Sequence, residues 1–207
     1  MQKLREAFAG LVVIVVGVLL ALAGDAAWAA RADRIREQEV LRDLLEEFRE
    51  NEAILLRDIE SNRKAKMAAA LWAGAMLGEL PLPADSVHAL LLAAQDDARF
   101  DPVTGALRSL IDGGELRLIH NSELRKALAG WTDRTEEARL TANSWDRGRQ
   151  SLVSLVLSFP PGALLGPSQR SAVRLTERAA AGHAGQVEAL LVRVGEIIAL
   201  IEGELDR

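Results

Sequence analysis

The architecture is decided by residues 7–30, which read AFAGLVVIVVGVLLALAGDAAWAA. Within this stretch, residues 7–24 contain no charged or hydrogen-bonding side chain. A helix of that length spans about 27 Å, close to the roughly 30 Å of a bilayer's hydrocarbon core. A helix also satisfies its own backbone hydrogen bonds, as lipid requires. We therefore expect residues 7–30 to form a transmembrane anchor behind a short N-terminal tail, residues 1–6.

The C-terminal end of this stretch has the residues of a membrane–water interface. Asp25 ends the apolar run, and Trp28 and Arg31 follow it. Tryptophan is enriched at interfaces, and a long arginine side chain can reach the headgroups from just inside the bilayer. We interpret Asp25, Trp28 and Arg31 as interfacial residues.

Small residues are spaced along the stretch so that they share one helical face. Gly10, Gly17 and Gly24 recur every seven residues, and Ala21 lies four residues after Gly17. Such a face lets two membrane helices approach closely, so these four residues are candidates for anchor packing. The alternative is that glycine is simply common in membrane helices.

A cleavable signal peptide is the alternative interpretation of the N-terminus. Lys3 and Arg5 form a basic start, and residues 27–29 resemble a cleavage site. The apolar run is longer than a signal peptide needs, and the helical pattern continues past Ala30, so we favour a retained anchor. Arginines after the span favour a cytoplasmic domain, whereas the signal-like start favours export. We expect a single-pass protein of the bacterial inner membrane with its C-terminal domain outside the cytoplasm.

The composition excludes several classes of function. The 207-residue chain has a net charge of −5, no cysteine and three histidines. It therefore has no basic footprint for nucleic acid, and disulfides and cysteine-based metal sites are impossible. We expect the lipid bilayer, together with a protein partner or a second copy of the chain, to be its partners.

The remainder of the chain has helical periodicity and no convincing strand pattern, so the predicted fold is all-α. We expect residues 31–80 to form a long charged membrane-proximal helix and residues 81–207 to form a helical bundle domain. The long helix has apolar residues at helical spacing and an opposite face of charged residues, including Glu46 and Glu47. It can form a coiled coil or pack on its own domain, and we favour the second because the repeat is short.

Local signals place the later helices. Asp85 is predicted to cap one helix, and Asp101 with Pro102 to start another that stops at residues 113–114. Asn121 or Ser122 should start a helix that runs to about residue 159. A last helix should extend from Ser168 almost to the C-terminus, with Gly182 and Gly185 as points where it could bend.

Two stretches resemble a family of uncharacterised bacterial proteins with one N-terminal membrane helix and a helical domain. One comprises VVIVVGVLLALAGDAAW and EQEVLRDLLEEFRENEAILLRDI; the other is TGALRSLIDGGELRLIHNSELRKALAGW. The resemblance covers roughly residues 8–62 and 100–131. Its pattern in this chain consists of Leu107, Leu110, Gly114, Leu116, Leu118, Ile119, Asn121, Leu124, Arg125 and Leu128. The tyrosine that often lies near Leu107 in the family is absent. The resemblance implies architecture and location, and it carries no activity.

Within that second stretch, the segment after the double glycine allows two interpretations. The segment 116–119 can plug the core of a helix–turn–helix corner, or His120, Arg117 and Arg125 can line a ligand site. We favour the structural corner.

Patterns of catalysis are missing from the sequence. His88, His120 and His183 are far apart and form no metal-binding motif. The adjacent acids at 96–97 and 136–137 diverge on a helix and cannot jointly grip a metal. We therefore expect no catalytic, cofactor-binding or metal-binding residues, and no enzymatic activity. The favoured hypothesis is a membrane-anchored interaction or scaffold protein that can self-associate; the alternative is a helical ligand-sensing domain that signals through the membrane-proximal helix to a partner.

Overall fold

All the regular elements in the described part of the chain are helices, which confirms the predicted all-α class. A computed structural model describes residues 2–96, 98–158 and 165–207, with the backbone alone for 2–15, 148–149 and 151–158. The elements, in order, are α1 (Gln2–Met76), α2 (Ala84–Ala93), α3 (Gly105–Asp112), the 3-10 helix η1 (Glu115–Leu118), α4 (Ser122–Ser158) and α5 (Pro167–Leu205).

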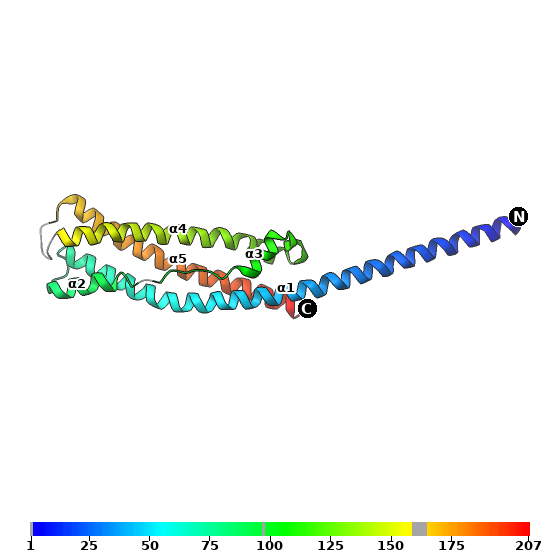
Figure 1. Cartoon of the computed structure of the whole chain (residues 1–207), viewed down its shortest axis with the longest axis horizontal. Helices are drawn as coiled ribbons and strands as arrows, with labels where there is room; N and C mark the ends of the chain where they lie inside the picture. Colours follow the sequence, from blue (N-terminus) through cyan, green and yellow to red (C-terminus); the bar gives the residue numbers. More distant parts are fainter. Residues whose placement is uncertain (1, 97, 159–164) are drawn as a thin grey trace.

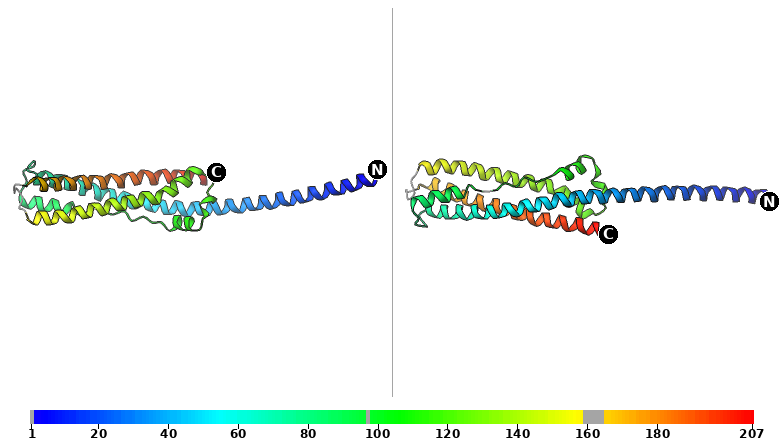
Figure 2. Two further views of the ribbon diagram at one scale, coloured as in Figure 1. Left: turned by 90° about the horizontal axis from the view of Figure 1, so that it is seen from above. Right: turned by 60° about the horizontal axis from the view of Figure 1, so that its bottom comes forward.

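Three long helices lie side by side and form an elongated bundle (Figure 1). α5 packs against both α1 and α4, and the short α2 packs against the last part of α1. The N-terminal part of α1 projects beyond the bundle, at the end where the C-terminus lies, in all the views of Figures 1 and 2. α1 is therefore both a bundle helix and a long extension from the bundle.

Burial along α1 changes abruptly at Glu37. Every residue from 16 to 36 is exposed, whereas Glu37 is 9 % exposed. Beyond it most of the apolar positions predicted from the periodicity are buried, among them Leu41, Phe48 and Leu55, whereas Leu45 is half-buried. These side chains join one hydrophobic core with α3, α4 and α5. Of the two arrangements that the sequence allowed, the structure has the long helix packed on its own domain.

The predicted anchor is only partly described. No helix in the described part of the chain is long and apolar enough to cross a membrane. Residues 7–15 of the predicted anchor lie outside the residues whose side chains are described. The transmembrane assignment therefore stays a prediction.

A tryptophan lies at the centre of the main core. Trp131 on α4 has no exposed surface. Its ring centroid lies 5.4 Å from that of Phe48 on α1 and 6.1 Å from that of Phe100. Both separations suit the tilted and edge-on contacts that aromatic rings favour. Trp131 thus links α4 to α1 and to the connection that precedes α3.

Four polar side chains of α1 are buried together with the apolar side chains of the same helix. We call Glu37, Glu47, Asn51 and Asn62 the polar stripe; each is 9 % exposed or less. The assignment of Glu47 to the charged, solvent-facing side of the helix was wrong, because its carboxylate is a hydrogen-bond acceptor for another element. Buried polar groups of this kind are stable only when they are hydrogen-bonded.

The polar stripe binds the extended connection between α2 and α3. We call residues 98–104 of this connection the strap. Asn51 Nδ2 donates to Val103 O and Asn51 Oδ1 accepts from Val103 N, both at 2.8 Å. Asn62 Oδ1 accepts a hydrogen bond from Ala98 N at 3.1 Å. Side chains of α1 therefore hold the backbone of the half-buried strap at Ala98 and Val103, where no neighbouring strand of the described chain supplies hydrogen bonds.

Glu47 takes the place of a local cap at the start of α3. Its Oε2 accepts from Ala106 N at 2.6 Å and its Oε1 from Leu107 N at 3.3 Å. The N-cap residue Thr104 makes no side-chain cap hydrogen bond. The carboxylate meets the positive end of the helix dipole, which stabilises it. Burial raises the pKa of Glu47, and the two backbone N–H groups partly oppose that rise.

Two predicted helix starts were wrong for related reasons. α3 begins at Gly105 rather than at Asp101–Pro102, because the strap stays extended along α1 and Glu47 caps the later residues. α2 begins at Ala84 with Pro83 as N-cap, so Asp85 lies in its first turn instead of capping it. In both places the cap that the sequence suggested is not used.

Three other local predictions are confirmed. The double glycine ends α3, with Gly114 left-handed at a φ of 66°. Asn121 caps α4, since its Oδ1 accepts from Glu123 N at 2.9 Å and from Leu124 N at 3.1 Å. The last helix is α5, and it continues without a break through Gly182 and Gly185.

Replacing Glu47 tests the role of the polar stripe in stability. Glu47→Ala leaves two amide groups at the start of α3 without their acceptor, which should lower the free energy of unfolding by about 1–3 kcal/mol. The exposed neighbour Glu46→Ala should change it by less than about 0.5 kcal/mol. Urea unfolding followed by circular dichroism measures both, and equal effects of the two substitutions would contradict the capping role.

Candidate functional site

The described part of the bundle contains a cleft of about 660 Å³. The strap and α3 form one side of the cleft, α4 forms the other side, and α5 forms the floor. Its apolar lining consists of Phe100, Pro102, Leu107, Ile111, Ala138, Ala142 and Val187. The volume is within the range of pockets that bind small molecules, about 300–1,000 Å³.

The cleft exists because an extended segment stands where a helix would otherwise pack. The strap runs along α1 and, with α3, lies between α1 and α4 (Figure 1). An extended chain is thinner than a helix with its side chains, so it leaves space next to α4. Ala138 and Ala142 on α4 enlarge that space, because their small side chains reach only a short way across it.

The charged side chains of the cleft are partly paired with one another. Arg139 binds Glu136 through two hydrogen bonds, Nε to Oε2 at 2.7 Å and Nη2 to Oε1 at 2.6 Å. These bonds lower the pKa of Glu136 and raise that of Arg139. Arg99 forms an ion pair with Asp146. Two of the three arginines in the cleft thus have a carboxylate partner within the chain.

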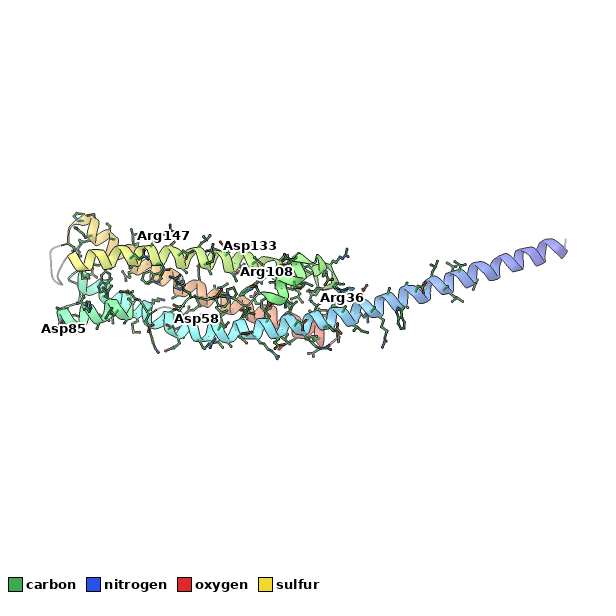
Figure 3. All side chains as sticks on the ribbon, in the orientation of Figure 1. Arg36, Asp58, Asp85, Arg108, Asp133 and Arg147 are labelled. Carbon is green, nitrogen blue, oxygen red and sulfur yellow. The ribbon has the colours of Figure 1, made fainter. Side chains whose placement is uncertain are left out.

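Arg108 differs from the other two arginines. It lies on α3, where Figure 3 labels it, and it makes no ion pair or hydrogen bond within the described residues. Asp101 and Asp112 also line the cleft, and neither has a partner among the residues that the structure describes. The cleft therefore presents one cationic and two anionic groups that are available to a ligand.

A buried histidine lies on the floor of the cleft. His183 on α5 is 4 % exposed, and its Nε2 lies 3.3 Å from Ala98 O in the strap. Asp58 of α1 interacts electrostatically with this histidine. Burial raises the pKa of Asp58, and electrostatic interactions with Arg57 and with His183 act in the opposite direction. His183 thus connects the floor to the strap and, electrostatically, to α1.

The segment that follows α3 is a structural corner and lies outside the cleft. Glu37 Oε1 accepts from His120 N at 2.6 Å, and Glu37 Oε2 lies 2.7 Å from His120 Nδ1. Arg125 Nη1 donates to Ile119 O at 2.5 Å and to His120 O at 3.0 Å. Ile119 is completely buried. Glu37 thus holds the corner against α1 through His120, and Arg125 ties α4 to the same segment. The segment forms the structural corner favoured for this stretch, with Ile119 in the core.

The candidate anchor residues all lie on the projecting part of α1, away from the cleft. Gly10 lies outside the residues whose side chains are described. Gly17, Ala21 and Gly24 are exposed, and a Cβ added at either glycine would meet no atom within 4 Å. The interfacial candidates are exposed too, namely Asp25, Trp28 (77 %) and Arg31.

The histidines do not meet. His88 lies on α2, His120 at the corner and His183 on α5. Among the described residues, no group of three or more histidine, aspartate or glutamate side chains is arranged to hold a metal ion.

Sequence reasoning missed the polar stripe and the cleft. The stripe has a signal in the sequence, because Glu37, Glu47, Asn51 and Asn62 share the face of the helix that carries the apolar residues. The cleft has none, since its lining comes from three stretches of the chain that are far apart in sequence, 99–112, 132–143 and 183–187.

Comparisons of this chain with known protein families, with curated proteins and with solved structures find no match.

Removing the two hydrogen bonds between Asn51 and Val103 should loosen the wall of the cleft that the strap forms. Asn51→Ala eliminates both hydrogen bonds to Val103, so exchange of the Val103 amide hydrogen should accelerate on the order of tenfold. Gln38→Ala, on the same helix but outside the polar stripe, is the control. Hydrogen exchange followed by NMR measures both. An unchanged rate at Val103 in Asn51→Ala would show that the strap is held by other contacts.

Proposed function

We propose that the protein is a membrane-anchored helical scaffold, whose anchor self-associates and whose bundle presents a surface to a protein partner. The observation that supports this best is the continuity of α1, which runs from residue 2 through the predicted anchor and into the core of the bundle. A single helix ties the position of the bundle to that of the anchor.

The exposed apolar side chains on the projecting segment support lipid as its environment. Val18 is 54 % exposed, Leu20 68 % and Leu22 60 %, and Val16 and Leu19 are similar. Successive residues point about 100° apart on a helix, so these side chains cover most of its circumference, and Gly17 and Ala21 occupy the remaining face. A helix that is apolar on every side is typical of a membrane span, whereas a protein contact would need one apolar face.

Two contacts join α1 to the other elements of the bundle at the point where the projecting segment begins. Arg36 pairs with Glu115 of η1, and Glu37 binds the corner at His120. The six residues from Arg31 to Arg36 would separate the bundle from the interface by about 9 Å if the anchor ends at Arg31. Such a link would hold the bundle near the membrane in a defined orientation.

Self-association through the anchor is supported by the small residues on one face. Gly17, Ala21 and Gly24 lie at helical spacing in the exposed segment. Small side chains let two backbones approach closely, and in lipid such packing drives helix association. The bilayer and a second copy of this chain are thus the partners we propose first.

Ligand sensing is the second candidate function, and the cleft is the observation that favours it. The strap forms one wall of the cleft and is bound directly to α1 through Asn51 and Asn62. A ligand that moved the strap would act on α1, which leads to the anchor. The signal would then pass to a partner protein.

The location follows from the same considerations. We propose that the chain is a single-pass protein of the bacterial inner membrane, with the bundle on the side away from the cytoplasm. The resemblance to uncharacterised bacterial membrane proteins supports this assignment, as does the basic start followed by a long apolar run.

Disulfide crosslinking in native membranes tests the anchor and its self-association together. The chain has no cysteine, so a single cysteine reports on one position. Ala21→Cys lies on the small-residue face and Leu19→Cys lies roughly opposite to it. After mild oxidation, Ala21→Cys should form dimers and Leu19→Cys should stay monomeric, with both variants in the membrane pellet after alkaline carbonate washing.

The possible failures have different meanings. Release of the full-length chain by carbonate would contradict the anchor. Retention in the pellet with only monomer for both variants would contradict self-association while leaving the anchor intact. Equal dimer yields for the two variants would show that the small-residue face is not the contact.

A further inference from the structure

We propose that the cleft between the strap and α4 is a binding site for a small amphiphile whose polar end carries one positive and one negative charge. This inference goes beyond the scaffold function and does not depend on it, because the cleft lies within the bundle. It rests on the shape of the cleft, on its apolar surface and on the charges that remain available around it.

The apolar part of the ligand would occupy the space that the strap leaves open. Phe100, Leu107 and Val187 contribute larger apolar side chains, and Ala138 and Ala142 supply the room. Several of these residues also belong to the main core or pack against it, so the apolar surface is continuous with the core and pre-formed. Burying an alkyl chain there gains about 0.8 kcal/mol for each CH₂ group.

The polar end would meet charges of both signs. Arg108 is available to an anionic group, and Asp101 and Asp112 are available to a cationic one. Because the two other arginines are bound to Asp146 and Glu136, they supply little additional attraction for anions. A multiply charged anion would be repelled by the two free carboxylates, and a simple cation would leave Arg108 unused.

One further polar group distinguishes the cleft from a hollow between surface side chains. His183 lines the floor of the cleft although it is only 4 % exposed. Its imidazole Nε2 lies within hydrogen-bond distance of Ala98 O in the strap. The site thus combines an apolar interior, a buried polar contact at its base and charged groups at its opening. This combination is typical of pockets for small amphipathic ligands.

Short-chain probes that differ only in the charge of the head group test the proposal. The full chain is kept in a neutral maltoside detergent and titrated with hexylphosphocholine, with the phosphodiester hexyl methyl phosphate, which carries a single negative charge, and with hexyltrimethylammonium, followed by calorimetry. We expect saturable binding of hexylphosphocholine, about fivefold tighter than either singly charged probe. Titration with L-phenylalanine distinguishes a free amino acid from a lipid head group as the source of the same zwitterionic chemistry.

Two variants and one control locate the binding. Arg108→Gln should weaken binding of hexylphosphocholine about fivefold and leave hexyltrimethylammonium unchanged. Ala142→Phe should fill the cleft and abolish binding of all the probes. Arg134→Gln removes an exposed arginine of α4 outside the cleft and should change nothing. Because Arg108 is exposed, its variant retains the fold and remains informative even if Ala142→Phe does not fold.

Three results would overturn the proposal. These are no saturable binding of any zwitterionic probe to the wild-type chain, equal affinity for the three hexyl probes, or equal effects of Arg108→Gln and Arg134→Gln.

Discussion

The structure depends on the hydrogen bonds between the polar stripe of α1 and the backbone of the connection that follows α2. Asn51 holds Val103 by two hydrogen bonds, and Glu47 accepts from the first amides of α3. Because these side chains are buried beside the apolar core, each would destabilise the fold without its partner. The strap therefore has one position along α1. That position determines where α3 begins, how far the strap stands from α4 and, as a result, where the cleft lies.

The same helix connects the two parts of the molecule. Its buried half supplies the core residues and the polar stripe, and its exposed half carries the apolar segment for which we propose a lipid environment. The change occurs at Glu37, which the corner holds through His120. An anchor that joined the bundle through a flexible linker could not restrict its orientation. With a continuous helix, both the scaffold function and the transmission of a signal from the strap become physically possible.

Much of the architecture is predictable from the sequence, because helical periodicity, glycines and the Asn121 cap are local signals. The start of α3 was mispredicted since Asp101 and Pro102 are a good local start, whereas the group that caps the helix, Glu47, is distant in sequence. Glu47 itself was assigned to solvent because charged residues are rarely buried. The cleft could not be predicted, since its walls meet only after α1, α4 and α5 pack. Long-range hydrogen bonds are thus what the local patterns leave out.

The central claim is that α1 is one continuous, ordered helix from the projecting segment into the bundle. The most direct measurement is the distance between two spin labels, one on each side of Glu37, in the full-length protein reconstituted into lipid. Labels at Ala29→Cys and Glu50→Cys occupy exposed positions on α1. A continuous helix predicts a narrow distribution of distances centred at about 32 Å, because the two labels are 21 residues apart and each residue adds roughly 1.5 Å. A broad distribution, or a narrow one centred well below that distance, would contradict the account.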